Sequence, residues 1–284
     1  MTTGAIIFAQ NNAGVDYVKL AVFAGNRIKT HLNIAVSIIT DSKDYLEVQF
    51  ADHPFEHIIE LPYEQSLSHQ QKKFYDGSLS HRVLDWKNLV RNQAYYLSPY
   101  DTTLVIDSDY VVSSSLLKQA LDADYDFQIY QQSMDLAVDR DKTSYDRINQ
   151  YSIPFYWATV FVFKKNDVME AFFNLVSDIK INWEYFKILY CISVPMFRND
   201  FAFSIAIHIM NGKTNSNFAS ALPGKMIYVS DRDYLIDMKD HKMSFLVEKK
   251  DYLGEYIAVK TSGLDVHIMN KQSLGRFIDG GSGV

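Results

Sequence analysis

Four short, nearly uninterrupted apolar runs constrain the fold of this chain most strongly. They lie at 5–9, 34–39, 58–61 and 103–106, and three of them end in polar or acidic residues. Such runs are typical of strands that are buried on both faces, as in parallel sheets. Between the first two runs, apolar residues recur at helical spacing: Val15, Val18, Val22, Ile28 and Leu32. The pattern predicts an open α/β sheet, mostly parallel and flanked by helices.

The second half of the chain continues this alternation less regularly. We predict strands at 127–130, 157–163, 226–229 and 264–269, and helices at 168–179 and 201–211. With 48% hydrophobic residues and no linker-like segment, residues 1–279 are expected to form a single domain. The Gly/Ser-rich residues 280–284 are expected to be a flexible tail.

The segment before the fourth run is predicted to contain a loop and then a helix. Residues 65–80 are polar without a clean period, which favours a surface loop. Ser80 is then a helix cap, followed by apolar residues at helical spacing: Val83, Trp86, Val90, Ala94 and Leu97. On such a helix Lys87 and Arg91 would project from the same face.

Charge and composition narrow the function classes. The 28 Lys and Arg against 34 Asp and Glu argue against general coating of nucleic acid. The lone Cys191 cannot form an internal disulfide and is expected to be buried. The sequence shows no secretion signal and no apolar stretch of about 18 residues. We therefore expect a cytoplasmic protein without a membrane span.

Two aspartates directly follow the fourth run. Asp107 and Asp109 flank the small Ser108, at the carboxyl end of a predicted strand, where open α/β sheets gather their ligands. Carboxylates at this spacing can hold one divalent cation, which neutralises phosphates as a Lewis acid. The alternative is that Asp107 caps a turn and Asp109 is solvated.

The segment Leu104-Val105-Ile106-Asp107-Ser108-Asp109 resembles the aspartate motif of GT-A glycosyltransferases. The resemblance implies a GT-A-type, nucleotide-diphospho-sugar transferase-like fold: an open mixed, mostly parallel sheet flanked by helices. It implies a nucleotide-binding half (1–112) and an acceptor-binding half (113–279). It also implies metal-dependent transfer of a hexosyl or pentosyl group from a nucleotide-sugar donor, UDP-linked, to a hydroxyl acceptor.

Glycogenin-like and galactosyltransferase-like retaining members of that family complete the metal site with a late histidine. By this resemblance Asp107, Asp109 and His267 would be the metal ligands, and Lys271 would contact phosphate. The glycine usual between that histidine and lysine is absent here, and the spacing is shorter. A shell of oxygen and nitrogen ligands favours Mn²⁺ over Mg²⁺. The alternative for His267 is an ordinary strand histidine.

Other residues are candidates for contacts with the donor. Base and ribose contacts are expected after the first two strands, although turn chemistry also favours such residues there; Ser108 is a further candidate within the aspartate motif. The candidates are Ala9, Gln10, Asn11, Asn12, Asp41 and Ser108. Lys87 and Arg91 would hold a diphosphate or simply form a solvated face.

Asp200 is the candidate catalytic residue. It opens a predicted helix, so it would cap that helix, contact the donor sugar, or both. In an inverting reaction it would deprotonate the acceptor hydroxyl. In a retaining reaction, which the histidine pattern favours, it would position the sugar.

Two other functions fit the same aspartates. A haloacid-dehalogenase-like phosphatase would use Asp107 as its nucleophile and would need later acids such as Asp231, Asp233 and Asp237. The position of the motif after about a hundred residues of α/β structure disfavours it, because that family carries it on the first core strand. A non-catalytic nucleotide-sugar binder is the other alternative. The acceptor stays open among a glycan, a protein, a small glycoside and a modified nucleobase.

Overall fold

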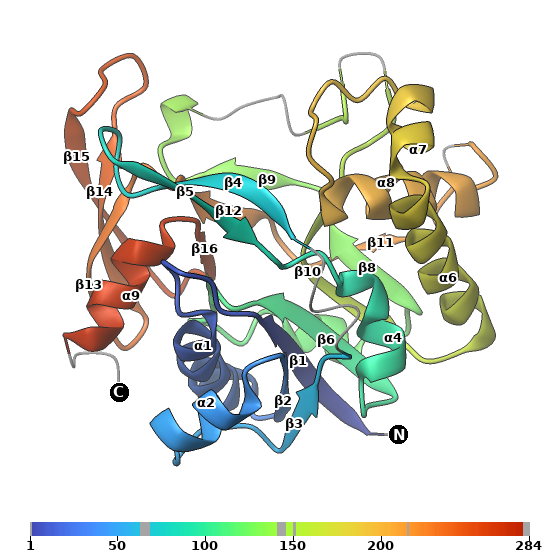
Figure 1. Ribbon diagram of the computed structural model, residues 1–284, viewed down its shortest axis with the longest axis horizontal. Coiled ribbons are helices and arrows are strands. Elements are labelled where there is room, and N and C mark those ends of the chain that lie inside the picture. The colour runs from blue at the N-terminus through green and yellow to red at the C-terminus, as the bar shows by residue number, and fades with distance from the viewer. Residues whose placement is uncertain (1, 63–68, 141–145, 150–151, 215, 281–284) are drawn as a thin grey trace.

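A seven-stranded sheet forms the centre of the computed structural model (Figure 1). The structure describes residues 2–62, 69–140, 146–149, 152–214 and 216–280. In spatial order the strands are β11 (Ser220–Ala221), β8 (Phe127–Tyr130), β10 (Trp157–Lys164), β6 (Thr102–Asp107), β1 (Thr3–Ala9), β2 (Ala35–Thr40) and β3 (His57–Glu60). Only β10 runs antiparallel to its neighbours, β6 and β8. The predicted fold class, an open mixed, mostly parallel sheet flanked by helices, is confirmed.

The predicted apolar runs form the buried middle of this sheet. In β1, residues 5–9 are at most 4% exposed, and β2 and β6 pair with it on either side in parallel register. Helix α1 (Tyr17–Leu32) packs against β1 and β2. Its N-cap is Asp16, whose side chain accepts a hydrogen bond from Lys19 N at 2.9 Å. Because β1, β2 and β6 run parallel, their carboxyl ends lie at the same edge of the sheet.

Helices and short 3-10 turns cover the remaining sheet surface. Helix α8 packs against β10, and α6 packs against α8 and the turn η1. Their bounds are α2 (Lys43–Gln49), η1 (Arg91–Gln93), α4 (Ala94–Leu97), α5 (Lys118–Asp122), η2 (Val138–Arg140), α6 (Asp167–Ile181), α7 (Trp183–Leu189), α8 (Asn199–Met210) and α9 (Lys271–Asp279). The helices at 168–179 and 201–211 are confirmed within two residues, whereas α2, α5, α7 and α9 were not predicted.

Two smaller sheets lie beside the central one. A four-stranded sheet has the order β7 (Tyr110–Val111), β16 (Val266–Ile268), β12 (Met226–Val229) and β9 (Ser133–Asp135). A three-stranded antiparallel sheet consists of β13 (Tyr234–Lys239), β14 (Lys242–Glu248) and β15 (Tyr256–Ser262). Of the strands in these two sheets, only β12 and β16 were predicted, at 226–229 and 264–269.

A β-hairpin replaces the predicted loop and helix. Strands β4 (Gln70–Tyr75) and β5 (His81–Trp86) pair antiparallel and extend between the three-stranded sheet and α8 (Figure 1). Residues 65–68 of the predicted loop lie outside the described residues. The helix predicted after Ser80 is wrong over its first half, because cross-strand pairing with β4 overrides the helical spacing of Val83 and Trp86. Helical structure begins only at Arg91.

Contacts at both ends hold this hairpin in place. At one end, Gln70 exchanges two hydrogen bonds with the backbone of Phe197, of 2.7 and 3.0 Å. At the other end, Ser78 Oγ donates to Glu248 and Tyr234 Oη donates to Asp76 O. The hairpin thus connects the segment before α8 to the three-stranded sheet.

Two further findings concern exposure. Cys191 is exposed, contrary to expectation, and so are Ile188 and Leu189 before it at the end of α7. None of the helices within the described ranges has the length and apolarity needed to span a bilayer.

Candidate active site

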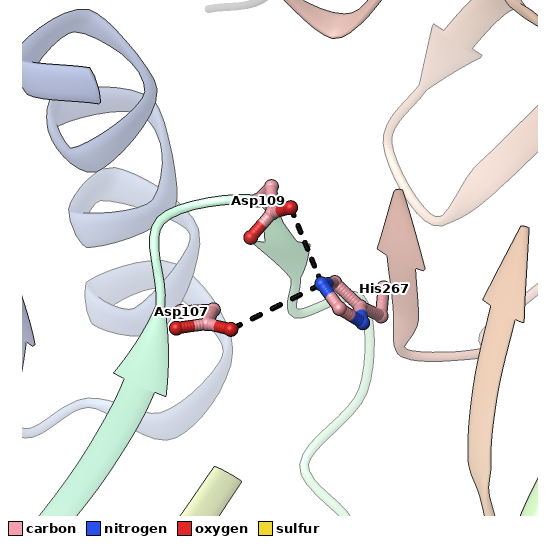
Figure 2. A group of neighbouring side chains, drawn as sticks. All are labelled: Asp107, Asp109 and His267. Carbon is pink, nitrogen blue, oxygen red and sulfur yellow. Dashed lines mark hydrogen bonds and ion pairs between the residues drawn. The ribbon is translucent and has the colours of Figure 1, made fainter. Parts of the chain in front are cut away.

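Three elements bring Asp107, Asp109 and His267 together (Figure 2). Asp107 is the last residue of β6, and Asp109 directly precedes β7. His267 lies on β16, which pairs antiparallel with β7 so that it stands opposite Tyr110. The backbone adds a hydrogen bond of 2.9 Å from Ile268 N to Asp109 O. The ladder between β7 and β16 therefore sets the distance from His267 to the aspartate pair.

The geometry of this group fits a divalent metal ion. His267 Nε2 lies 3.2 Å from Asp109 Oδ2 and 4.0 Å from Asp107 Oδ2. One ligand atom from each residue lies within 4.8 Å of the others. His267 Nδ1 is buried and has no hydrogen-bond partner within the described part of the chain. Two carboxylate oxygens and an imidazole nitrogen that converge in this way could together hold one metal ion.

Two cations lie against the aspartates, the buried Arg91 and the partly buried Lys271. Lys271 Nζ lies 2.6 Å from Asp109 Oδ2, and the Arg91 guanidinium forms an ion pair with Asp107 and donates to Ala158 O. Burial alone would raise the pKa of Asp109, but Lys271 and then His267 hold it well below its usual range. Asp109 is therefore kept as a carboxylate.

The pKa values of the two cations respond differently to this setting. Burial lowers the pKa of Arg91 to about 10, against the opposing effect of Asp200 and Asp109. For Lys271, burial lowers the pKa, but the Asp109 carboxylate raises it above its usual value. Both side chains keep their positive charge at neutral pH.

Asp200 lies in the first turn of α8 and does not cap it. The cap residue is Arg198, without a side-chain cap hydrogen bond. Asp200 Oδ1 accepts from Ala158 N at 2.9 Å, and Oδ2 accepts from Arg198 Nη2 at 2.6 Å. The capping interpretation is therefore wrong, because both carboxylate oxygens are held across the site by β10 and Arg198.

A cavity of about 730 Å³ joins these residues. It is lined by the metal-ligand group and by Arg91, Asp200 and Lys271. A second cavity of about 460 Å³ is lined by Asn11 and Asn12, and it shares Val15, Lys271 and Gln272 with the first. Lys271 therefore stands where the two cavities meet.

The remaining donor candidates take structural contacts of their own. Asn11 Oδ1 accepts from Val18 N, and Asn12 Oδ1 accepts from Gly14 N and Val15 N. Ala9, Gln10 and Ser108 are at most 4% exposed, and Gln10 donates to Asp41 at 3.3 Å. Ala9, Gln10, Asp41 and Ser108 are not among the described residues that line either cavity.

Lys87 and Arg91 do not share a helix face. Lys87 follows β5 and lies 3.5 Å from Asp41, whereas Arg91 opens η1 and pairs with Asp107. Lys87 and Arg91 are therefore not placed to share one anion, and they do not form a common solvated face. Each of them pairs with its own carboxylate.

Sequence reasoning missed several residues that line the larger cavity. The most informative are Lys72, Trp86 and Arg198. Lys72 and Trp86 belong to the hairpin that was not predicted. Of the three, only Arg198 could have been indicated by the sequence, because it lies two residues before the candidate Asp200.

Comparisons with known proteins find similarity in structure only. No protein-family model matches the chain, and no curated protein matches it in sequence. A structure of the galactosyltransferase LgtC with donor and acceptor sugar analogs aligns at 13% identity and a TM-score of 0.46, covering 77% of this chain and 72% of that one. The glycosyltransferase GlyE of Streptococcus pneumoniae TIGR4 aligns at 12% identity and a TM-score of 0.43. The match covers 78% of this chain and less than half, 46%, of GlyE.

Proposed function

We propose that this chain is a metal-dependent glycosyltransferase that moves a sugar from a UDP-linked donor to a hydroxyl acceptor. The observation that carries the proposal is the convergence of Asp107, Asp109 and His267 beside a cavity of about 730 Å³. A divalent ion, Mn²⁺ or Mg²⁺, bound there would act as a Lewis acid on the departing diphosphate.

The residues around the ion provide the rest of the donor site. Lys271, at the junction of the two cavities, is suited to contact the diphosphate, because its ammonium already faces the metal-binding aspartates. The smaller cavity beside Asn11 and Asn12 would then take the nucleoside. In this proposal residues 1–112 bind the nucleotide together with His267 and Lys271, and the rest of residues 113–279 binds the acceptor.

Asp200 is proposed to act on the sugar. Its carboxylate is oriented by Ala158 N and by Arg198, so it is held rigidly at the wall of the cavity. Both oxygens of this carboxylate already accept hydrogen bonds, so it is poorly placed to take a proton from an acceptor hydroxyl. This favours retention, in which Asp200 orients the donor sugar and the metal stabilises the leaving group.

The phosphatase alternative is less consistent with the side-chain contacts. It requires Asp107 as a free nucleophile, but Asp107 is paired with Arg91. It also requires later acids, but both oxygens of Asp233 accept from Arg140. Neither carboxylate is available for the role.

Nucleotide release tests the proposal. The purified chain is incubated with a panel of UDP-sugars, with Mn²⁺ or with EDTA, and free UDP is measured. We expect UDP release that requires metal and falls by about 100-fold or more in Asp109→Asn. The matched control is Asp237→Asn, an exposed aspartate on β13, which should behave as wild type. A wild type that neither releases UDP nor is stabilised by any nucleotide with metal would refute the proposed function.

A further inference from the structure

One acid of the larger cavity lacks a cationic partner among the described residues. Six described Asp and Glu residues line this cavity. Five of them form ion pairs: Asp107 with Arg91, Asp109 with Lys271, Asp135 with Arg140, Asp200 with Arg198, and Glu248 with Arg232. The sixth is Asp231, which forms no ion pair with any cation that the structure describes. Of these six carboxylates, that of Asp231 is therefore the most available to a ligand.

The strand order brings Asp231 to the same side of the molecule as Lys271. Strand β12 runs parallel to β16, with Tyr228 opposite His267. Asp231 follows the end of β12 by two residues, and Lys271 follows the end of β16 by three. The carboxyl ends of neighbouring parallel strands lie at one edge of a sheet, where ligands gather. Asp231 therefore lines the cavity from the edge at which Lys271 contacts Asp109.

A tight turn fixes the backbone of Asp231 and leaves its carboxylate free. Ser230 N donates to Asp233 Oδ2 at 2.8 Å, and Asp233 N donates to Ser230 O at 3.1 Å. Asp233 is buried and also accepts from Arg140. The Asp231 carboxylate itself is approached only by Ser230 Oγ among the described donors, at 3.5 Å, which is the outer limit of a hydrogen bond. The turn thus holds an unused hydrogen-bond acceptor at the surface of the cavity.

Lys72 is the opposite charge that acts most strongly on Asp231. It lies on β4 and lines the same cavity, and at the hairpin tip Gly77 N donates to Asp231 O at 3.4 Å. Burial raises the pKa of Asp231, against the opposing effect of Lys72 and then of Lys271. Burial lowers the pKa of Lys72 to about 8, and Asp231 opposes this more than Asp109 does. The two groups therefore influence each other, yet no ion pair joins them in the part of the chain that the structure describes.

Resting on the proposed function, we propose that Asp231 and Lys72 bind neighbouring hydroxyl groups of a neutral sugar, which is the acceptor. A hydroxyl both donates and accepts hydrogen bonds, so it can donate to the Asp231 carboxylate and accept from the Lys72 ammonium. An anion at this place would be repelled by Asp231 and a cation by Lys72, so charged groups are disfavoured. A carboxylate has about four lone-pair sites and an ammonium three donors. Two neighbouring hydroxyls of a sugar ring use more of these sites than the single hydroxyl of a serine does.

The experiment measures UDP release from each UDP-sugar with Mn²⁺, with and without a second compound. The neutral compounds are methyl glucoside, methyl galactoside, lactose and maltose. The others are methyl glucuronoside, methyl glucosaminide and a serine-containing peptide. We expect at least one neutral sugar to raise UDP release, with a KM at least about tenfold lower than that of the charged sugars.

Variants of the two side chains test their part in acceptor binding. Asp231→Asn should raise the KM of the neutral sugar by at least about tenfold and leave the KM of the UDP-sugar at its wild-type value, which also shows that the variant is folded. Lys72→Gln should raise the KM of the neutral sugar as well. In the double variant the rise should be less than the product of the two single effects, because both groups bind the same hydroxyls. The matched control Asp237→Asn changes an exposed aspartate of β13 outside the cavity and should behave as wild type.

Each outcome bears on the proposal. A lower KM for lactose or maltose supports a glycan acceptor, and a lower KM for a methyl glycoside supports a small glycoside. The proposal is overturned if no neutral sugar raises UDP release, if the peptide or a charged sugar does so equally well, or if Asp231→Asn leaves the KM of the neutral sugar unchanged. An Asp231→Asn variant that raises the KM of the UDP-sugar instead would place Asp231 at the donor. Metal-dependent UDP release without any second compound separately tests the proposed function.

Discussion

Lys271→Met should make the stability of this protein depend on divalent metal. The Lys271 ammonium lies 2.6 Å from Asp109 Oδ2, with the two side chains 14% and 4% exposed. Removing one partner of a buried ion pair costs about 3 to 5 kcal/mol, because the other charge stays buried alone. For a chain of 284 residues the loss corresponds to a fall in Tm of about 5 to 8 °C.

A bound metal ion should restore most of that loss. In the variant, Asp109 would remain a carboxylate beside Asp107 with no lysine, so a divalent ion would supply the missing positive charge. Binding to the folded state stabilises it by mass action. We therefore expect Mn²⁺ to raise Tm several degrees more in Lys271→Met than in the wild type.

The assay is thermal unfolding in EDTA and in saturating Mn²⁺, followed by circular dichroism. The control is Lys19→Met, which removes an ion pair of 2.8 Å to Asp279, a residue whose side chain is 63% exposed. That pair is worth at most about 1 kcal/mol, and its loss should not depend on metal. If Lys271→Met lowers Tm equally in EDTA and in Mn²⁺, the reasoning about Asp109 is refuted.

Three further predictions concern the surroundings of Lys72, Gly77 and Arg91. The pKa of Lys72, about 8 instead of 10.5, means that the unfolded chain binds more protons between these values. Wild-type stability should rise over that range relative to Lys72→Met in urea unfolding. Gly77→Ala should cost about 2 kcal/mol and expose the hairpin to protease, because Gly77 has φ +78° and its Cβ would stand 1.6 Å from Tyr234 Oη. Arg91→Met should lower the free energy of unfolding by about 3 to 5 kcal/mol, because it leaves Asp107 buried without its partner.

Different results would contradict each of these expectations. Parallel stability curves for wild type and Lys72→Met between pH 8 and 10 would mean that this ammonium is solvated. A Gly77→Ala variant with wild-type proteolysis would show that the hairpin tip tolerates a side chain. An Arg91→Met protein as stable as the wild type would show that Asp107 finds another partner.

Buried elements of this fold were predictable and half-exposed ones were not. Strands β1, β2 and β6 are covered on both faces, so their sequences are continuous apolar runs. Strands β4 and β5 have exposed residues along their length, and their pairing depends on contacts with Phe197 and Glu248 that are distant in sequence. Local spacing could not reveal those contacts, and the helical spacing from Val83 onward was coincidental.

The site was predictable where a strand end fixed it. Asp107 and Asp109 follow a buried strand, and the resemblance to GT-A enzymes indicated His267, which lies beside them. The lysine four positions later also reaches Asp109, although the usual glycine is missing. Lys72 and Arg198 line the cavity because of the hairpin and of the start of α8. No local sequence motif indicated either residue.

The ladder between β7 and β16 also has a consequence for the order of synthesis. Asp109 and His267 are 158 residues apart, and the strand that positions the histidine is followed by α9 alone among the described elements. A nascent chain that has emerged only as far as β15 holds both aspartates but lacks the imidazole ligand. The group of Asp107, Asp109 and His267 can therefore assemble only once β16, which follows all the other described strands, has been translated.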